Sequence, residues 1–197
     1  MKEFWNKRYA TENYVYGTSP NAFFKYELSK LGVGNILLPA EGEGRNAVYA
    51  ADQGWKVFAF DYSFEARRKA LSLADKNQVS IHYEVVSFDE VNFKPGLFDC
   101  IAMFFVHLPP KERLHYHQKI ISWLKPGGTL LLEAFSKNQF NKSSGGPKNM
   151  EMLFAEEDLK ADFAELEKFE IDELNTFLNE GSFHKGEASV IRMKGIK

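Results

Sequence analysis

Short apolar runs alternate with longer amphipathic segments along most of this chain. The short runs have the length of buried strands, and the longer segments carry apolar residues at helical spacing. This alternation is typical of a mostly parallel β-sheet with helices on both faces. We therefore expect an α/β fold, namely a Rossmann-like, doubly wound sheet of about seven strands that is mostly parallel.

The pattern also places the individual elements. Strands are predicted at 35–39, 56–61, 81–88, 98–105 and 129–135, and helices at 44–54, 63–78, 110–128 and 155–163. Two helices precede them, in 2–13 and in 19–31, the second with Ser19 as its N-cap and Pro20 at its first position.

The end of the chain departs from the alternation. The segments 164–178 and 180–194 read as two strands joined by a glycine-containing turn without a helix, so they must be antiparallel to each other. The polar segment 136–149 is longer than a routine connection, and we expect it to be a lid or a substrate loop.

Length and composition indicate one globular domain. The chain has 197 residues, of which 44% are hydrophobic and 26% charged. This length suits a single core, so we expect one domain with an N-terminal helical cap at 1–33 and a Rossmann-like core at 34–197. The aromatic share of 15%, with 18 Phe, suggests aromatic surfaces around a pocket, although a Phe-rich core explains it as well.

Charge and apolar content exclude several partners. The net charge is −2 and no basic tract is present, which argues against nucleic acid. No apolar run approaches the ~18 residues of a membrane span, and no leader opens the chain, so we expect a cytoplasmic protein. The single Cys100 agrees with a reducing compartment and reads as a buried strand residue. His115 and His117 face different ways on a helix, which argues against a metal pair.

A glycine loop stands between the first strand and its helix, in the sequence LLPAEGEGRN at 37–46. Residues 42–47 satisfy the pattern G-x-G-x-x-G/A, and the next strand ends in Asp61, where an acid can accept ribose hydroxyls. The sequence therefore predicts an adenosine-containing ligand, either NAD(P) or S-adenosylmethionine.

The charges of this loop favour one of the two ligands. Glu41 and Glu43 would oppose a pyrophosphate at the helix N-terminus, whereas the sulfonium and ammonium of S-adenosylmethionine are cationic. Arg45 could neutralise one of these carboxylates, which weakens the preference. The expected antiparallel end of the chain adds weight to S-adenosylmethionine.

The sequence resembles the class I S-adenosylmethionine-dependent methyltransferases, and within them the small bacterial branch related to tellurite-resistance and thiopurine methyltransferases. The matching segments are FWNKRYATENYVYGTSPNAFF (4–24), AEGEGRNAVYAADQGWKVFAFDYS (40–63), FDCIAMFFVHLPP (98–110), LKPGGTLLLEAFSKNQ (124–139) and EGSFHKGEASVIRM (180–193). This resemblance implies a seven-stranded sheet that ends in an antiparallel hairpin.

The resemblance also implies a set of cofactor-binding residues. The loop would pass under the methionine part of the cofactor, Asp61 would hold the ribose, and the segment before residue 24 would fold over the cofactor. The implied residues are Trp5, Tyr9, Tyr16, Ala40, Glu41, Gly42, Glu43, Gly44, Asn46, Asp61, Tyr62, Ser63, Ser87, Phe88, Phe104 and Phe105.

Three positions depart from the family pattern. Leu38 stands where the family commonly has an acid, Ala40 where it has a glycine, and Ser87 where it has an acid near the adenine. Glu41 or Glu43 could substitute for the missing acid at Leu38.

Methyl transfer requires alignment and exclusion of water rather than a covalent nucleophile. His107 follows a strand end and is the candidate general base and substrate residue, while a structural histidine is equally compatible with its position. Arg45 is a second candidate substrate residue. His184 reads as a hairpin residue.

By analogy with the branch, the acceptor is a small molecule, such as a thiol or a chalcogen oxyanion. We expect a monomer or a weak homodimer that binds neither nucleic acid nor membrane. The alternatives are an NAD(P)-dependent oxidoreductase and a non-catalytic protein that binds S-adenosylmethionine.

Overall fold

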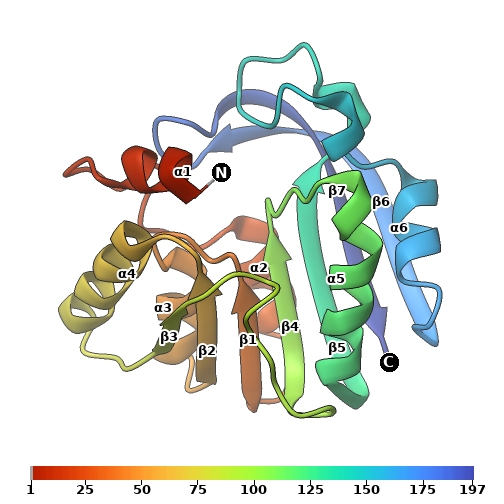
Figure 1. The fold of residues 1–197 in the computed structure, drawn as a ribbon, viewed down its shortest axis with the longest axis horizontal. Helices are drawn as coiled ribbons and strands as arrows, with labels where there is room; N and C mark the ends of the chain where they lie inside the picture. The colour runs from red at the N-terminus through yellow and green to blue at the C-terminus, as the bar shows by residue number, and fades with distance from the viewer. Residues whose placement is uncertain (1) are drawn as a thin grey trace. The chain divides into compact units, whose positions relative to one another are not determined.

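The computed structural model describes residues 2–197, which form helices around a single sheet (Figure 1). The strands are β1 (Asn35–Pro39), β2 (Lys56–Asp61), β3 (His82–Val85), β4 (Phe98–Phe104), β5 (Leu124–Phe135), β6 (Lys168–Asn179) and β7 (Lys185–Ile196). The α-helices are α1 (Lys2–Tyr9), α2 (Ala22–Leu28), α3 (Arg45–Asp52), α4 (Phe64–Lys76), α5 (Pro110–Trp123) and α6 (Glu156–Asp162). Two short 3-10 helices occupy Lys137–Gln139 and Met150–Met152.

The strand order in the sheet is β3-β2-β1-β4-β5-β7-β6. The pairs β1 with β2, β2 with β3 and β4 with β5 are parallel, whereas β7 is antiparallel to both β5 and β6. The predicted fold class, a mostly parallel seven-stranded α/β sheet with an antiparallel C-terminal pair, is confirmed.

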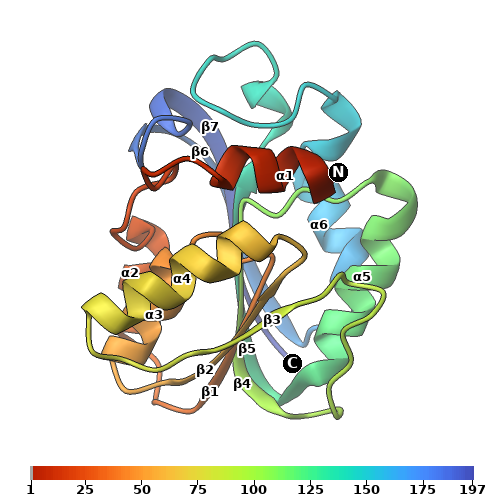
Figure 2. The same ribbon diagram turned by 60° about the vertical axis from the view of Figure 1, so that its left-hand side comes forward.

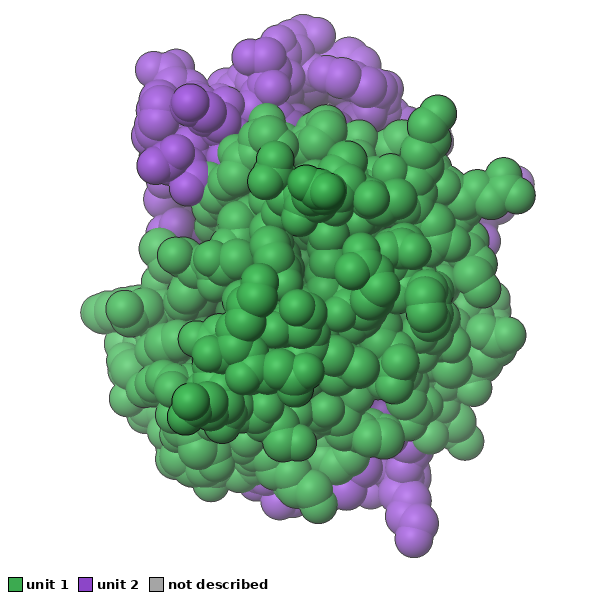
Figure 3. Space-filling view, turned by 90° about the vertical axis from the view of Figure 1, so that its left-hand side faces the viewer, with its two compact units in different colours: residues 1–92, 180–183 green, residues 93–179, 184–197 purple. Residues whose placement is uncertain are grey.

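The chain divides into two compact units, coloured separately in Figure 3. Unit 1 comprises the chain up to Asn92 together with Glu180–Phe183, and unit 2 comprises Phe93–Asn179 and His184–Lys197. The prediction of one domain with a cap at 1–33 is not tested by this division and stays a prediction.

Unit 1 contains β1, β2 and β3 with helices packed on them (Figures 1 and 2). Ile36, Leu37 and Leu38 of β1 are fully buried, as expected of a strand covered on both faces. Helix α4 begins at Ser63, whose Oγ accepts a hydrogen bond from the N–H of Ala66 at 3.2 Å. Helix α1 packs against α4 and lies beyond the carboxyl ends of the strands of this unit, which places the N-terminal segment near the loop that follows β1.

Unit 2 contains β4 to β7, with α5 packed against β5 and α6 against both α5 and β6. The largest side chains of its core include Trp123, Phe135 and Phe163, all about 1% exposed or less. Along β6 most side chains are partly or fully exposed, which fits its position at the edge of the sheet.

Several predicted boundaries are wrong for identifiable reasons. Helix α2 begins at Ala22, and Asn21 rather than Ser19 is its N-cap, because the Asn21 Oδ1 atom accepts from the N–H of Phe24 at 3.0 Å. Helix α5 ends at Trp123, not at 128, since Pro126 disfavours helical backbone at the residue before it. Strand β3 ends at Val85, three residues earlier than predicted.

The polar segment 136–149 is anchored within unit 2. The Gln139 Oε1 atom accepts from the N–H of Ser189 at 2.8 Å, and the Ser144 hydroxyl donates to the carbonyl of Glu187 at 2.6 Å. The side chains of Gln139 and Ser144 are about 2% exposed. The segment is therefore held against β7 along part of its length, which an open loop would not be.

Within residues 2–197, no helix combines the length and the apolar character that crossing a bilayer requires.

Candidate functional site

The loop after β1 has a backbone that glycine adopts readily and alanine does not. Ala40, Gly42 and Gly44 have φ values of 48°, 66° and 89°. A Cβ atom at Gly44 would lie 2.6 Å from the Cβ of Ala70, so the glycine allows α3 to approach α4. A Cβ at Gly42 would lie 2.8 Å from the Tyr9 hydroxyl oxygen, so Gly42 allows the N-terminal helix to lie close to the loop.

Glu41 caps the helix that follows the loop. Its Oε1 atom accepts hydrogen bonds from the backbone N–H groups of Asn46 at 2.9 Å and Ala47 at 2.8 Å. Burial raises the pKa of Glu41 to about 7, against the opposing effect of these two donors and of Arg45. The N–H groups at the start of α3 that a pyrophosphate would require are thus already bonded to a carboxylate of the chain.

Glu43 is part of a buried ion pair. Its Oε1 atom lies 2.7 Å from the Lys69 Nζ atom, and both side chains are less than 5% exposed. Lys69 also donates to the carbonyl of Asn13 at 2.6 Å, and the N–H of Tyr16 donates to the other oxygen of Glu43 at 3.2 Å. Lys69, rather than Arg45, therefore neutralises Glu43, and the pair holds the N-terminal segment against the loop.

Arg45 pairs with a residue far along the chain. Its Nη2 atom lies 2.9 Å from Glu180 Oε2, and Asn21 Nδ2 donates to the other oxygen of Glu180 at 3.0 Å. The Arg45 Nη1 atom is buried and has no hydrogen-bond partner among the described residues.

Asp61 ends β2 as a buried carboxylate, 4% exposed. Its Oδ1 atom accepts from the N–H of Ser63 at 2.8 Å. Burial raises the pKa of Asp61 to about 6, although backbone N–H groups of Ser63, Gly42 and Tyr62 favour the ionised form. Tyr62 is half-buried, and this burial, with the Asp61 charge, raises its pKa to about 12.

The three aromatic residues predicted from the N-terminal segment come together. Trp5 stacks on Tyr9 with ring centroids 5.4 Å apart, and Tyr16 lies 6.3 Å from Tyr9 and 6.4 Å from Trp5. Burial raises the pKa of Tyr9 well above its ordinary value, as expected for a hydroxyl enclosed beside the loop. Unit 1 thus brings the glycine loop, Asp61 and this aromatic cluster into one region.

Other predicted residues of unit 1 have structural partners. Asn46 Oδ1 accepts from the N–H of Asn21 at 2.9 Å, and the Ser63 hydroxyl donates to Asn6 at 2.6 Å. The Ser87 hydroxyl donates to Glu90 at 3.0 Å, and the Phe88 ring packs edge-on against Phe60 at 5.1 Å. Ser87 and Phe88 lie beyond β3 and are partly exposed.

Phe104, Phe105 and His107 belong to unit 2. Phe105 follows β4 with φ 56°, an unusual value for a bulky residue, and its N–H donates to the carbonyl of Glu133 at 2.7 Å. The Phe105 ring lies 4.8 Å from Phe135 and 4.4 Å from His184. His184, predicted as a hairpin residue, is 6% exposed and is part of this aromatic group.

Both ring nitrogens of His107 are engaged. Nδ1 lies 2.7 Å from the carbonyl oxygen of Met152, and Nε2 accepts from the N–H of Phe135 at 3.3 Å. This arrangement requires a neutral ring with the proton on Nδ1. Burial lowers the pKa of His107 to about 4, so the ring remains neutral near pH 7. These contacts favour the structural reading of His107 over that of a base.

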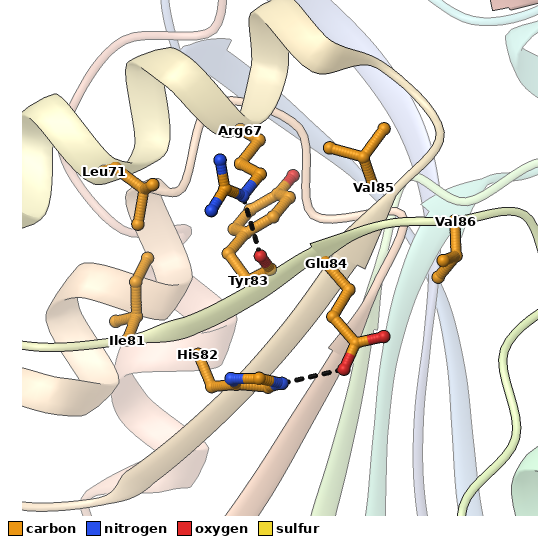
Figure 4. Close-up of a pocket in the computed structure, with 8 residues that line it drawn as sticks. All are labelled: Arg67, Leu71, Ile81, His82, Tyr83, Glu84, Val85 and Val86. Atoms are coloured by element: carbon orange, nitrogen blue, oxygen red, sulfur yellow. Dashed lines mark hydrogen bonds and ion pairs between the residues drawn. The ribbon is translucent and has the colours of Figure 1, made fainter.

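A groove of about 540 Å³ lies elsewhere in unit 1, along β3 and α4. Arg67 Nε donates to the carbonyl of Tyr83 at 2.9 Å, and His82 lies 2.8 Å from Glu84 (Figure 4). None of the residues predicted for the cofactor lines it. No cluster of three His, Cys, Asp or Glu side chains within residues 2–197 could hold a metal ion.

Comparison with known proteins identifies the enzyme class. Residues 36–128 match the family model described as a methyltransferase domain. This part of the chain is therefore a methyltransferase domain. The match supports the methyltransferase resemblance, and it supports S-adenosylmethionine rather than NAD(P) as the cofactor. No curated protein sequence matches the chain.

Solved structures support the same fold for this methyltransferase. One structure comes from work on the conversion of a disulfide bond into a thioacetal group during echinomycin biosynthesis. It is 16% identical to this chain, with a TM-score of 0.78, and the match covers 100% of this chain and 92% of the other. An S-adenosylmethionine-dependent methyltransferase from Methanosarcina mazei has a TM-score of 0.68 and is 19% identical. The match covers 91% of this chain and 98% of the other. TehB from Haemophilus influenzae has a TM-score of 0.69 and is 16% identical. The match covers 100% of this chain and 66% of the TehB chain.

The geometry of unit 1 suits the methyltransferase cofactor. Asp61 is a buried carboxylate, the glycines bring backbone close to their neighbours, and the helix N-terminus needs no phosphate because Glu41 occupies it. The sequence reading missed four residues that organise this region: Arg8, Lys69, Tyr83 and Glu180. Tyr83 donates its hydroxyl to the carbonyl of Gly42 at 2.7 Å, and only its alternating position in β3 could have indicated an inward side chain.

Proposed function

We propose that this methyltransferase acts on a small molecule with a soft nucleophilic atom, such as a thiol or a chalcogen oxyanion, as in the small bacterial branch related to tellurite-resistance and thiopurine methyltransferases. The observation that carries this proposal is the bonding of His107, because both its ring nitrogens are occupied. Cys100 is also withdrawn from chemistry, since burial strongly raises the pKa of its thiol. An acceptor that is nucleophilic near neutral pH needs no base, and a thiol with a pKa of about 8.5 meets that condition.

The reaction would be an in-line displacement. The acceptor lone pair forms a bond to the methyl carbon as the bond from that carbon to the sulfonium sulfur breaks, and a thiol acceptor has released its proton to water beforehand. The protein's part is alignment and exclusion of water. The aromatic cluster of Trp5, Tyr9 and Tyr16 beside the loop suits that part.

For the cofactor we propose the following roles in unit 1. The Asp61 carboxylate accepts hydrogen bonds from the ribose hydroxyls, with Tyr62 beside the adenine, while the backbone of Ala40 to Gly44 lies under the methionine part. Ser87 and Phe88 line the adenine. Glu41 and Glu43 act indirectly, since their carboxylates are bonded to α3 and to Lys69.

Two of the solved relatives also fit a small acceptor. The structure from echinomycin biosynthesis concerns the conversion of a disulfide bond, which is sulfur chemistry. A relative from Haemonchus contortus is a phosphoethanolamine N-methyltransferase, which acts on a small molecule. Both likenesses are of fold, so the acceptor class of this chain is an extension from them.

The test is methyl transfer across a panel of acceptors. Methyl-labelled S-adenosylmethionine would be incubated with small thiols, selenite, tellurite and small amines, and binding of S-adenosylhomocysteine would be measured in parallel by calorimetry. We expect tight binding and transfer to the thiols or chalcogen oxyanions. Transfer to amines alone would contradict the proposal.

A further inference from the structure

Arg8 of α1 places a cation beside the aromatic cluster. Its Nη1 atom donates to the Tyr16 hydroxyl at 2.9 Å. No carboxylate among residues 2–197 forms an ion pair with it, and its other N–H groups have no hydrogen-bond partner there, whereas a guanidinium has five such donors. Because these N–H groups have no partner among the described residues, they are available to a ligand.

Aromatic rings hold the Arg8 guanidinium in place. Its Cζ atom lies 4.5 Å from the ring centroid of Phe4 and 4.5 Å from that of Phe183, and 5.2 Å from that of Trp5. Contacts of this kind fix the plane of the guanidinium and remove water from its faces, while its edge keeps its donors. A cation prepared in this way is suited to an oxyanion or a carboxylate, which accepts two parallel hydrogen bonds.

A chain of contacts connects Arg8 to the loop. Its partner Tyr16 packs on Tyr9, and the Tyr9 hydroxyl lies at Gly42. The ring of Tyr16 also lies 6.2 Å from Phe183. Arg8 is thus connected to the glycine loop through Tyr16 and Tyr9.

A second guanidinium acts on the same tyrosine. Burial raises the pKa of Tyr16, while the charges of Arg8 and Arg45 both oppose that rise. The Nη1 atom of Arg45 is buried and has no hydrogen-bond partner among the described residues. A buried donor left without an acceptor costs about 1–3 kcal/mol, although the charge of Arg45 is already paired with Glu180.

We infer that Arg8, with the Tyr16 hydroxyl, forms the anion-binding part of the acceptor site, so that the methyl acceptor carries an oxyanion or a carboxylate group. The inference rests on the proposed function and narrows it. Among thiol acceptors, the inference favours those that carry a carboxylate group. Among chalcogen acceptors, it favours the oxyanions.

Calorimetry on the full chain tests this inference without turnover. Selenite and mercaptoacetate would be titrated into the protein saturated with S-adenosylhomocysteine, with uncharged 2-mercaptoethanol as the comparison. For Arg8→Gln we expect at least tenfold weaker binding of both anions. The affinity for S-adenosylhomocysteine and for 2-mercaptoethanol should stay within twofold.

Two further variants and a control protect the experiment against misfolding. Arg8→Lys keeps the charge and the contact with the rings but not the planar donors, and Tyr16→Phe keeps the ring and removes the hydroxyl, so each should weaken anion binding by about threefold to tenfold. Arg68→Gln removes an exposed arginine of α4 that pairs with Glu65, and it should bind like the wild type.

Each outcome decides one question. If the wild type does not bind S-adenosylhomocysteine, the proposed function fails. If it does bind, but takes up neither anion or takes them up equally well in the Arg8 variants, the proposed function stands and the role of Arg8 is overturned.

Discussion

The loops that follow β1 and β4 begin alike and then differ in chemistry. Each begins with a non-glycine residue at positive φ, Ala40 at 48° and Phe105 at 56°. After Ala40 come two carboxylates that are bonded to backbone N–H groups or to Lys69, whereas after Phe105 comes His107, neutral and surrounded by aromatic rings. Strained backbone at both strand ends is typical of functional loops.

The difference shows that the two loops provide different chemical environments. The loop after β1 is built from fixed charges and buried donors, which suit a polar, cationic cofactor. The loop after β4 offers an apolar, uncharged environment, which suits the exclusion of water. Five variants or conditions test this contrast, the first with the strongest predicted consequence and the last with the weakest.

The buried ion pair of the β1 loop should be the most sensitive to substitution. Glu43→Gln leaves Lys69 buried without its counter-charge, and we expect a loss of about 3–5 kcal/mol in the free energy of unfolding, measured with urea. Glu65→Gln is the control, because its pair with Arg68 on the same helix is exposed and should cost under about 1 kcal/mol. Equal losses in the two variants would show that the pair does not anchor the N-terminal segment.

The Asp61 carboxylate should matter for binding. We expect Asp61→Ala to reduce cofactor affinity more than tenfold, since a charge-assisted ribose contact contributes about 1.5–3 kcal/mol. Calorimetry with S-adenosylmethionine measures this, and Asp75→Ala, at an exposed position of α4, is the control. Unchanged affinity would remove Asp61 from the site.

His107 distinguishes a structural from a catalytic role in the β4 loop. His107→Gln loses contacts to Met152 and Phe135, and we expect it to lower the free energy of unfolding by about 1–3 kcal/mol. Its rate of transfer at saturation should stay within about tenfold of the wild type, whereas loss of a general base costs about 10²–10⁴-fold. His115→Gln, at an exposed position, serves as the control. A loss of rate in the larger range for His107→Gln would show that His107 acts as a general base.

Cofactor affinity should fall as the pH is lowered. In the proposed site the ionised form of Asp61 accepts the ribose hydrogen bonds. Its pKa is about 6, so protons should compete with the cofactor below that pH. Only about a tenth of this carboxylate is ionised at pH 5, and affinity should be about tenfold weaker there than at pH 8. In Asp61→Asn the step near pH 6 should disappear, and a step that persists would point instead to Glu41, whose pKa is about 7.

Backbone strain at the start of the β1 loop should have a small effect on stability. Ala40→Gly relieves about 1–2 kcal/mol of left-handed strain and adds about 0.5–1 kcal/mol of unfolded-state entropy, so a net stabilisation of about 0.5–1 kcal/mol is expected. Thermal unfolding should show a rise of about 1–4 °C. Ala51→Gly, within helix α3, should instead lower the stability. If both variants changed the stability in the same direction, the backbone at Ala40 would not be strained.

Particular residues show how far sequence reasoning reached. The strand and helix periodicities predicted the α/β class and the antiparallel pair of β6 and β7, because the absence of a helix between two strands leaves no other arrangement. The place of Asp61 at the end of β2 and of the glycines in the loop after β1 also followed from a local pattern, while their role in the site stays a prediction. The charge of Glu43 was read correctly but its partner was not, since Lys69 is 26 residues away in sequence and only packing brings the two together.

The order and type of the elements, the glycine loop and the class of ligand could be inferred from the sequence alone. These features depend on local periodicity and on the conformational freedom of the backbone. Tertiary contacts decided that Glu41 caps α3, that Glu180 reaches Arg45 and that His107 is bonded at both nitrogens. They also decided that Arg8 has donors without a partner among residues 2–197. A side chain's charge can be read from the sequence. Which partner satisfies it, and which donor remains for a ligand, depends on contacts between segments that only folding brings together.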